Sequence, residues 1–259
     1  MKLTFLGTGT SFGVPQIGCQ CDVCTSNDPR DKRTRSGALV ETDAGARILI
    51  DTPPELRLQL IAAHIDRVDA VLFTHEHADH IHGIDDVRAL SVRGKAPLRM
   101  YGPDETVRTL RHRFDYIFDD RMRPLPGTTK PEGELTMLVA GEHVTIAGVD
   151  VLPIAVPHGN TMVFGYRIGA LGYVTDAKLL PVEAIEALRG VKVLVLNALF
   201  WKSHPTHMSV PEAVEAARAV GAERTYLTHL THDNRHADLE AALPAGLLPA
   251  YDGLAVSIG

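Results

Sequence analysis

The sequence lacks any apolar run long enough to cross a membrane, which takes about 20 consecutive apolar residues. The apolar segment after Met1 is too short for the hydrophobic region of a secretory signal peptide. Low-complexity segments, short-period repeats and a clear interdomain linker are also missing. These absences favour one domain that spans residues 1–259, in the cytoplasm and with no membrane as a partner.

A basic excess is missing as well. The 26 Lys and Arg residues are outnumbered by 32 Asp and Glu residues, and the formal net charge is −6 with 13 histidines counted as neutral. Because general nucleic-acid binding requires a basic face, nucleic acid is not the expected partner. Hydrophobic residues make up 45% of the 259 positions, which is enough for one large core.

Cysteine is scarce, and the only three cysteines are Cys19, Cys21 and Cys24. An odd number of cysteines this close together is a poor disulfide framework but a good set of thiolate ligands. Three thiolates can occupy three corners of a tetrahedral zinc site, and our candidate for the fourth ligand is His232. The pattern therefore predicts one structural zinc. Three reduced cysteines without a metal are the alternative.

Strand-like and helix-like segments alternate in two similar halves of the chain. In the first half we expect strands at 3–6, 47–50, 70–73 and 98–101, and helices at 53–64, 84–92 and 104–113. Residues 114–133 are rich in charge and proline and are expected to form an exposed insertion. In the second half we expect strands at 136–139, 144–147, 149–156, 162–168, 173–175, 192–196, 224–227 and 254–257, and helices at 182–188 and 210–220. Two sheets with helices outside them, an α+β fold, would satisfy this order.

The strand at 70–73 is followed by the densest group of ligand-type side chains, Thr74-His75-Glu76-His77-Ala78-Asp79-His80. Imidazole and carboxylate ligands suit zinc, manganese or iron. His75 and His77 alternate along an extended segment, so both can project to one side. Asp79 and His80 can then serve a second ion, and two neighbouring cations can activate a water molecule. A polar surface loop with incidental histidines is the alternative, which the density of the pattern disfavours.

The pattern His-x-His-x-Asp-His after a hydrophobic strand resembles the metallo-β-lactamase superfamily. The resemblance implies a four-layer αββα sandwich with metals at one edge of the paired sheets. It also implies further ligands at His158, Asp176 and His229. The implied first ion is held by His75, His77 and His158, and the second by Asp79, His80 and His229, with Asp176 as the bridging ligand.

Other segments narrow the resemblance to the PhnP-like phosphodiesterases, of the phosphoribosyl cyclic phosphate phosphodiesterase type. They are the opening residues 7–11, the cysteine cluster, which implies an accessory zinc, and residues 80–88. The carboxylate at Asp176 occupies the place where β-lactamases proper have a cysteine. The resemblance implies two divalent ions, zinc, manganese or iron, and a small phosphorylated substrate. That substrate is a sugar phosphate or nucleotide diester, cyclic forms included.

The catalytic residues implied are Asp79 and His207. A water molecule held by Asp79 and Asp176 is expected to attack phosphorus. The departing alkoxide needs a proton or a positive partner, and the resemblance places His207 near the phosphate, with His204 as its competitor. Asp51 resembles an inner aspartate that orients metal ligands by hydrogen bonding. The alternatives are an ordinary loop histidine for His207 and a strand-end turn residue for Asp51.

Three other functions remain open. A tRNA 3′-processing nuclease would need a basic arm, and in residues 105–125 basic side chains are interleaved with Asp115, Asp119 and Asp120. The basic residues are Arg108, Arg111, Arg113, Arg121 and Arg123. A glyoxalase II-like thioester hydrolase usually has a separate C-terminal domain, which we do not find. An inactive metal-binding scaffold is disfavoured by the intact ligand set. The exact substrate, the active-site metals and a homodimer stay open.

Overall fold

The strands fall into two groups that follow the two halves of the chain, except that the last strand, β14, belongs to the first group. The first group of strands is β1 (Lys2–Gly7), β2 (Gly37–Glu41), β3 (Arg47–Ile50), β4 (Ala70–Leu72), β5 (Leu98–Gly102), β6 (Gly133–Met137) and β14 (Ala255–Ser257). The second is β7 (Val144–Ile146), β8 (Val149–His158), β9 (Thr161–Ile168), β10 (Leu171–Val174), β11 (Val193–Asn197), β12 (Arg224–Thr228) and β13 (Leu247–Pro249). The helices are η1 (Pro29–Asp31), α1 (Leu56–Ala62), α2 (Ala78–Ile81), η2 (Ile84–Asp86), α3 (Val87–Gly94), α4 (Asp104–Arg113), α5 (Asp115–Phe118), α6 (Val182–Leu188), α7 (Val210–Val220) and α8 (His236–Ala242).

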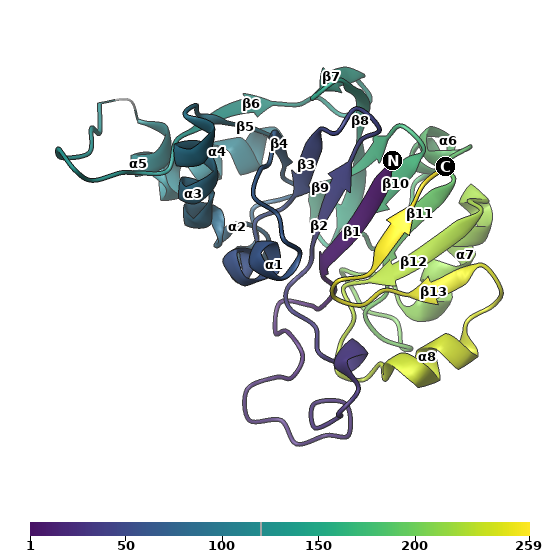
Figure 1. The fold of residues 1–259 in the computed structure, drawn as a ribbon. Helices are drawn as coiled ribbons and strands as arrows, with labels where there is room; N and C mark the ends of the chain where they lie inside the picture. Colours follow the sequence, from purple (N-terminus) through teal and green to yellow (C-terminus); the bar gives the residue numbers. More distant parts are fainter. Residues whose placement is uncertain (120) are drawn as a thin grey trace.

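Each group of strands forms one sheet of the sandwich (Figure 1). The computed structural model describes residues 1–119 and 121–259, in which the sheets have the strand orders β14-β1-β2-β3-β4-β5-β6 and β13-β12-β11-β10-β9-β8-β7. Asp120, one of the acidic residues of the 105–125 stretch, lies outside the described residues. Among the helices described, none is long and apolar enough to span a bilayer.

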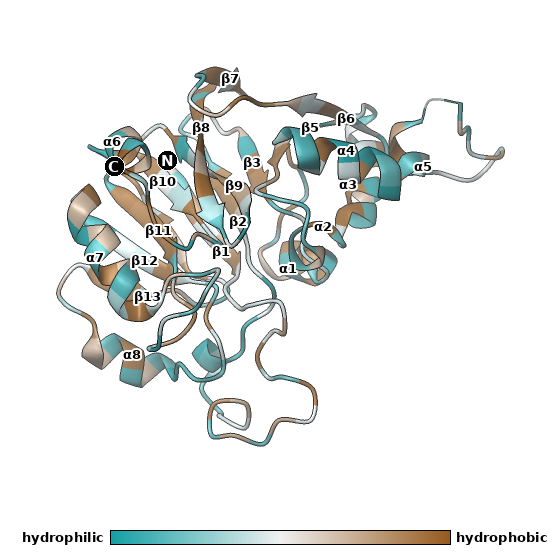
Figure 2. Cartoon of the chain, turned by 180° about the vertical axis from the view of Figure 1, so that it is seen from behind, coloured by the Kyte–Doolittle hydropathy of each residue, from teal (hydrophilic) through white to brown (hydrophobic). Residues whose placement is uncertain are grey.

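Alternating side chains explain the four layers. In β3, Ile48 and Ile50 pack between the sheets, whereas Leu49 packs under the helices of the first half. Residues 193–196 of β11 alternate in the same way between the intersheet core and the helices of the second half. Because successive strand residues face opposite sides, each sheet is buried on both faces. Figure 2 shows the hydrophobic colour concentrated in the strands. The predicted αββα sandwich is confirmed.

The topology brings several strand ends to one edge. β3, β4 and β5 run parallel, and so do β10, β11 and β12. Parallel strands have their carboxyl ends at the same edge of a sheet, where ligands commonly bind in open α/β sheets. The segments that leave β3, β4, β10 and β12 carry Asp51, the histidine motif, Asp176 and His229, respectively. This alignment gathers residues that are far apart in the sequence.

The expected insertion at 114–133 is only partly exposed. Its beginning forms α5, in which Ile117 is 2% exposed. The ammonium group of Lys130 donates to the carbonyl oxygens of Tyr116, Ile117 and Asp119 at 3.1–3.3 Å. These contacts satisfy carbonyls at the end of a short helix, which explains why the segment folds back onto α5. α8 and β13 were not anticipated from the sequence.

Candidate metal centres

The histidine motif follows β4 in an extended conformation and then turns into α2. The rings of His75 and His77 are 4.5 Å apart, and the ring of His158, at the end of β8, is 5.5 and 5.1 Å from them. One donor atom from each of these three residues lies within 4.8 Å of the others. The backbone N–H of Phe164 in β9 donates to the carbonyl of Thr74 at 3.0 Å, which fixes the motif against the second sheet.

A second group of donors adjoins the first. Donor atoms of Asp79, His80 and His229 lie within 4.8 Å of one another. One oxygen of Asp176 is 3.2 Å from Nε2 of His229, and its other oxygen is 3.3 Å from Nε2 of His80. Asp176 also groups with His75 of the first set. The carboxylate of Asp176 therefore lies between the two groups, where a bridging ligand would be expected.

Three of the residues at this edge have an unusual backbone conformation. Asp51, Asp176 and His229 have φ values of 62°, 58° and 57°. This left-handed region is uncommon for residues other than glycine, and such strain tends to occur at functional sites. Each of the three follows a strand end, and the turn directs its side chain toward the donor groups.

Asp51 orients one of the imidazoles. Its Oδ1 accepts the Thr74 backbone N–H at 2.8 Å, and its Oδ2 accepts the Thr74 hydroxyl at 2.8 Å and Nδ1 of His80 at 2.7 Å. Since the side chain is fully buried, these contacts set its position. The bond to Nδ1 leaves Nε2 of His80 facing the donor groups, an arrangement typical of a residue that orients a metal ligand.

The donor groups fit divalent cations. Nε2 of His75, His80 and His229 is buried and makes no well-aligned hydrogen bond, although oxygens of Asp176 lie 3.2 and 3.3 Å from two of these nitrogens. A buried polar atom without a partner costs about 1–3 kcal/mol, so an arrangement with three of them aimed at one volume needs an explanation. Imidazole nitrogens and carboxylate oxygens at these spacings could be satisfied by zinc, manganese or iron ions.

The charges at the donor groups also favour a bound cation. Burial alone would lower the pKa of His80, but the carboxylates of Asp176 and Asp79 hold that pKa well above its ordinary value. Burial alone would raise the pKa of Asp176, but the imidazoles of His229 and His80 hold it well below its ordinary value. The carboxylates therefore favour positive charge at this position, and a metal ion that binds there would displace a proton.

His207 lies beside these donors, in the segment between β11 and α7. Its Nε2 is 2.9 Å from Oδ1 of Asp176, and its ring stacks on that of His229 at 5.0 Å. His204, the competing candidate, is one step further out, with its ring 5.4 Å from that of His207. The structure thus brings His207 to the centre, whereas His204 contacts Phe200 and does not group with the donors.

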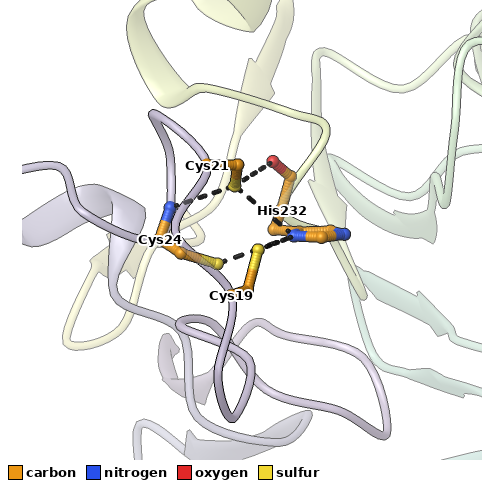
Figure 3. Close-up of side chains that lie close together, drawn as sticks. All are labelled: Cys19, Cys21, Cys24 and His232. Atoms are coloured by element: carbon orange, nitrogen blue, oxygen red, sulfur yellow. Dashed lines mark hydrogen bonds between the residues drawn. The ribbon is translucent and has the colours of Figure 1, made fainter.

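The three cysteines and His232 form a separate cluster (Figure 3). Nδ1 of His232 is 3.3, 3.5 and 3.6 Å from the sulfurs of Cys19, Cys21 and Cys24. Zinc–sulfur and zinc–nitrogen bond lengths at a tetrahedral angle require an S···N separation of about 3.5 Å. The backbone N–H of Cys24 lowers the pKa of the Cys21 thiol to about 7, whereas burial raises the pKa of Cys24 to about 11. The four donors fit one zinc ion.

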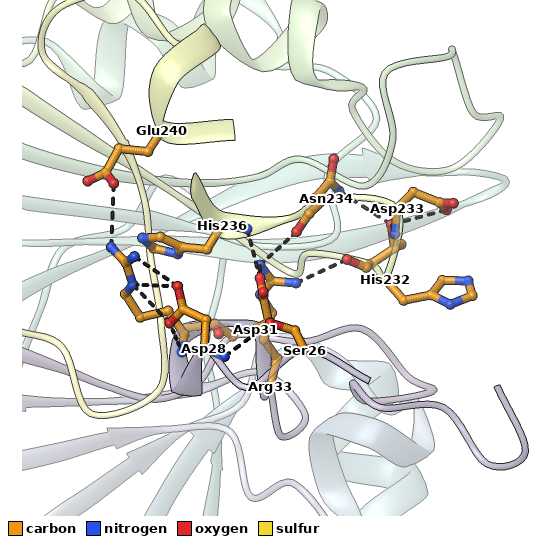
Figure 4. Close-up of polar contacts among 12 residues, drawn as sticks. Ser26, Asp28, Asp31, Arg33, His232, Asp233, Asn234, His236 and Glu240 are labelled. Atoms are coloured by element: carbon orange, nitrogen blue, oxygen red, sulfur yellow. Dashed lines mark hydrogen bonds and ion pairs between the residues drawn. The ribbon is translucent and has the colours of Figure 1, made fainter. Parts of the chain in front are cut away.

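A buried arginine joins the cysteine loop to the loop that carries His232 (Figure 4). Arg33 donates to the carbonyls of Thr231 and Asn234 at 3.1 and 2.8 Å, and its guanidinium lies 3.6 Å from the carboxylate of Asp31. Asp31 in turn accepts the backbone N–H of His236 at 2.7 Å. Because His229 and His232 belong to the same segment, Arg33 supports both candidate metal sites.

Several residues that support the proposed metal ligands were not predicted from the sequence. Asn197 binds the backbone N–H and carbonyl of Ala177 at 2.8 and 3.0 Å, which holds the turn after Asp176. The Tyr166 hydroxyl donates to the carbonyl of Phe73, just before the histidine motif. The only sequence feature that could have indicated Asn197 is that it is a polar residue at the end of an apolar strand. No sequence feature indicated the role of Tyr166.

Replacing Cys21 by serine is expected to lower the melting temperature and to remove about one zinc ion per chain. The reason is that the binding energy of a structural zinc contributes to folding. Differential scanning calorimetry and elemental analysis of both proteins measure these effects. Gln20→Ala, an exposed change in the same loop, is the control. A Cys21→Ser protein with the melting temperature and metal content of the wild type would exclude the accessory zinc.

Comparisons with known proteins agree with this fold. A model of the β-lactamase superfamily domain matches residues 46–230. A solved structure of a new diphosphatase from the PhnP family has 41% sequence identity and a TM-score of 0.90, with 100% of this chain and 98% of that chain covered. Zinc-bound PqqB from Methylobacterium extorquens has 17% identity and a TM-score of 0.79, with 99% and 100% covered, and shows the shared fold alone.

A curated relative, the octanoyltransferase of Porphyromonas gingivalis, is 39% identical over 259 residues, which is 98% of this chain. The chain spans about half the length of that relative, 51%. The family model covers most of the chain, and the PhnP-family structure matches it from end to end. The chain therefore belongs to the metallo-β-lactamase superfamily and is a PhnP-like member of it.

Proposed function

We propose that the protein hydrolyses a phosphodiester bond in a small phosphorylated sugar or nucleotide, cyclic forms included. The observation that carries this proposal is the imidazole of His207, which is 2.9 Å from Asp176 and, although it lies within 4.8 Å of the donors of His158 and Asp176, is not needed to complete either ligand set. A phosphodiester expels an alkoxide, which is a strong base and requires a proton as it departs. A histidine in this position is suited to deliver that proton.

We assign His75, His77 and His158 to one divalent ion and Asp79, His80 and His229 to the other, with Asp176 shared. Ions held there would supply Lewis-acid polarisation of the phosphoryl group and of a water molecule. We assign the cysteine cluster with His232 to a structural zinc. Asp51 orients His80, and the whole chain, residues 1–259, acts as one domain.

Side chains of the protein can accept and supply the protons that this hydrolysis requires. The attacking water forms the new P–O bond and loses a proton to a carboxylate, Asp79 or Asp176. His207, with a hydrogen on both ring nitrogens, gives its Nε2 hydrogen to the leaving oxygen as the old P–O bond breaks. Oδ1 of Asp176 is 2.9 Å from Nε2 of His207, so the proton taken from the water can then pass to the vacated nitrogen. The products are a phosphomonoester and an alcohol, and His207 is ready for another cycle.

Specific observations bear on two alternative functions. Hydrolysis of a diphosphate linkage is a second candidate, because the 41% identical neighbour is a diphosphatase. The tRNA-processing alternative is weakened by the local contacts of the basic residues in 105–125. Arg108 pairs with Asp104, Arg121 pairs with Asp119, and Arg111 donates to a backbone carbonyl of β6.

A panel of substrates tests the proposed function. Protein loaded with zinc, manganese or iron is expected to turn over bis(p-nitrophenyl) phosphate and a cyclic alkyl phosphodiester. It should be much slower on a thioester and on a precursor tRNA. Faster turnover of a nucleoside diphosphate sugar than of any diester would favour the diphosphatase alternative. Preference for the precursor tRNA or the thioester would overturn the proposal.

A further inference from the structure

We infer that Thr206 is a positioning residue whose hydroxyl holds the His207 imidazole with Nε2 toward Asp176. This inference rests on the proposed function, because the orientation matters only if His207 transfers a proton. Thr206 lies immediately before His207 in the segment Pro205-Thr206-His207. No part of the sequence pattern drew attention to it.

Thr206 contacts three imidazoles. Its hydroxyl oxygen is 2.7 Å from Nδ1 of His207 and 3.2 Å from Nδ1 of His204. Its backbone carbonyl is 3.1 Å from Nδ1 of His158, a proposed metal ligand. The threonine methyl lies so close to Gly159 that a Cβ added to this glycine would approach it to 2.8 Å. Thr206 is therefore held by its neighbours, and its hydroxyl has little freedom to move away.

The hydrogen-bond donors can be assigned from chemistry. An ionised carboxylate only accepts hydrogen bonds, so Nε2 of His207 carries the proton that faces Asp176. A backbone N–H only donates, and that of Thr206 points to Nδ1 of His204 at 3.4 Å. Nδ1 of His204 is therefore an acceptor. The remaining polar atom is Nδ1 of His207, which faces the Thr206 hydroxyl.

A hydroxyl suits this place because it can donate one hydrogen bond while it accepts another. The Thr206 hydroxyl donates to Nδ1 of His204 and accepts the hydrogen on Nδ1 of His207. Nε2 of His207 is then held facing Asp176 at 2.9 Å. A side chain without a hydroxyl would leave Nδ1 of His207 unpaired and the ring free to rotate.

The test compares Thr206→Val, which keeps the shape but removes the hydroxyl, with Thr206→Ser, which keeps the hydroxyl. Thr206→Val is expected to lower kcat on an alkyl phosphodiester by about 10- to 100-fold, the usual effect of losing an orienting hydrogen bond. KM and the content of metal should be unchanged, and turnover of bis(p-nitrophenyl) phosphate should fall little. Thr206→Ser should stay within about threefold of the wild type, on the same scale. Thr206→Ala provides a second hydroxyl-free variant if the valine protein does not fold.

Nitrogen NMR of histidine-labelled, metal-loaded protein gives a readout that does not depend on activity. In the wild type and Thr206→Ser, the two ring nitrogens of His207 should give two separate signals. In Thr206→Val these signals should move toward each other as the ring flips between orientations. Separate signals together with unchanged kcat in Thr206→Val would overturn the inference, as would an equal loss of kcat in Thr206→Ser.

Failure of the inference can be separated from failure of the proposed function. If His207→Ala loses rate on the alkyl diester but Thr206→Val does not, the role of His207 stands and that of Thr206 is wrong. If His207→Ala loses no rate, the proposed role of His207 is wrong, and the inference falls with it.

Discussion

Replacing Asp79 by alanine is expected to lower kcat/KM on a phosphodiester by about 100- to 1,000-fold or more, with the fold unchanged. The cation that Asp79 would help to hold stabilises negative charge in the transition state, and losing one such electrostatic contribution costs about this much. Asp79 also lies within 4.8 Å of the donors of His80 and His229, so its loss should weaken one of the two proposed ions. Steady-state kinetics and elemental analysis of the purified variant measure both effects.

The matched control for Asp79→Ala is Asp150→Ala, because Asp150 is 59% exposed and pairs with His143 away from the centre. This control should retain its activity and metal content. An anomalous-scattering map of loaded wild-type protein should show two ions within roughly 4 Å of each other. A single ion in fully loaded protein, or an active Asp79→Ala protein, would contradict the assignment.

Replacing His207 by alanine is expected to lower the rate on an alkyl phosphodiester by about 100- to 10,000-fold, the range of a general acid. Both ions of the centre should remain, because His75, His77, His158, Asp79, His80, Asp176 and His229 are unchanged. The loss should be much smaller with bis(p-nitrophenyl) phosphate, since p-nitrophenolate departs without a proton. Rates on the two substrates and the metal content are the measurements.

The outcomes for His207→Ala separate three roles. An equal loss on both substrates would show that a positive imidazolium binds phosphate, without delivering a proton. Loss of an ion would show that His207 is a metal ligand. No loss of rate would exclude His207 as the general acid and make His204 the next candidate. His143→Ala, an exposed histidine change at the far end of the second sheet, should have no effect and serves as the control.

The order of strand-like and helix-like segments predicted two sheets with helices outside them, and the family resemblance supplied the four-layer αββα arrangement. In the structure, residues 193–196 face the two cores in turn, because successive strand residues point to opposite sides of a sheet. The motif from His75 to His80 could also be predicted from the sequence, because its residues are close together in the chain. They occupy the end of one strand and one turn of a helix. The segment at 114–133 was predicted only in part: residues 121–129 are exposed, but the segment also forms α5, and Lys130 reaches back to the carbonyls of that helix.

His158, Asp176 and His229 were assigned by resemblance, and no local pattern links them. The structure brings them together because the carboxyl ends of β10 and β12 and the end of β8 meet at the same edge as that of β4. Their role as ligands stays a prediction until metal is measured. The same applies to His232, which lies 208 to 213 positions from the three cysteines.

Only the tertiary structure revealed Arg33, Asn197 and Thr206. Arg33 reaches a carbonyl 198 positions away, and a hydrogen bond of that range leaves no periodic trace in the sequence. Thr206 acts through atoms of three histidines that the turn before α7 happens to surround. Ligands are restricted in type by the chemistry of metals, so a sequence can suggest them. The groups that orient ligands need only one donor or acceptor at the right place, which many residue types can provide, and so only the folded chain identifies them.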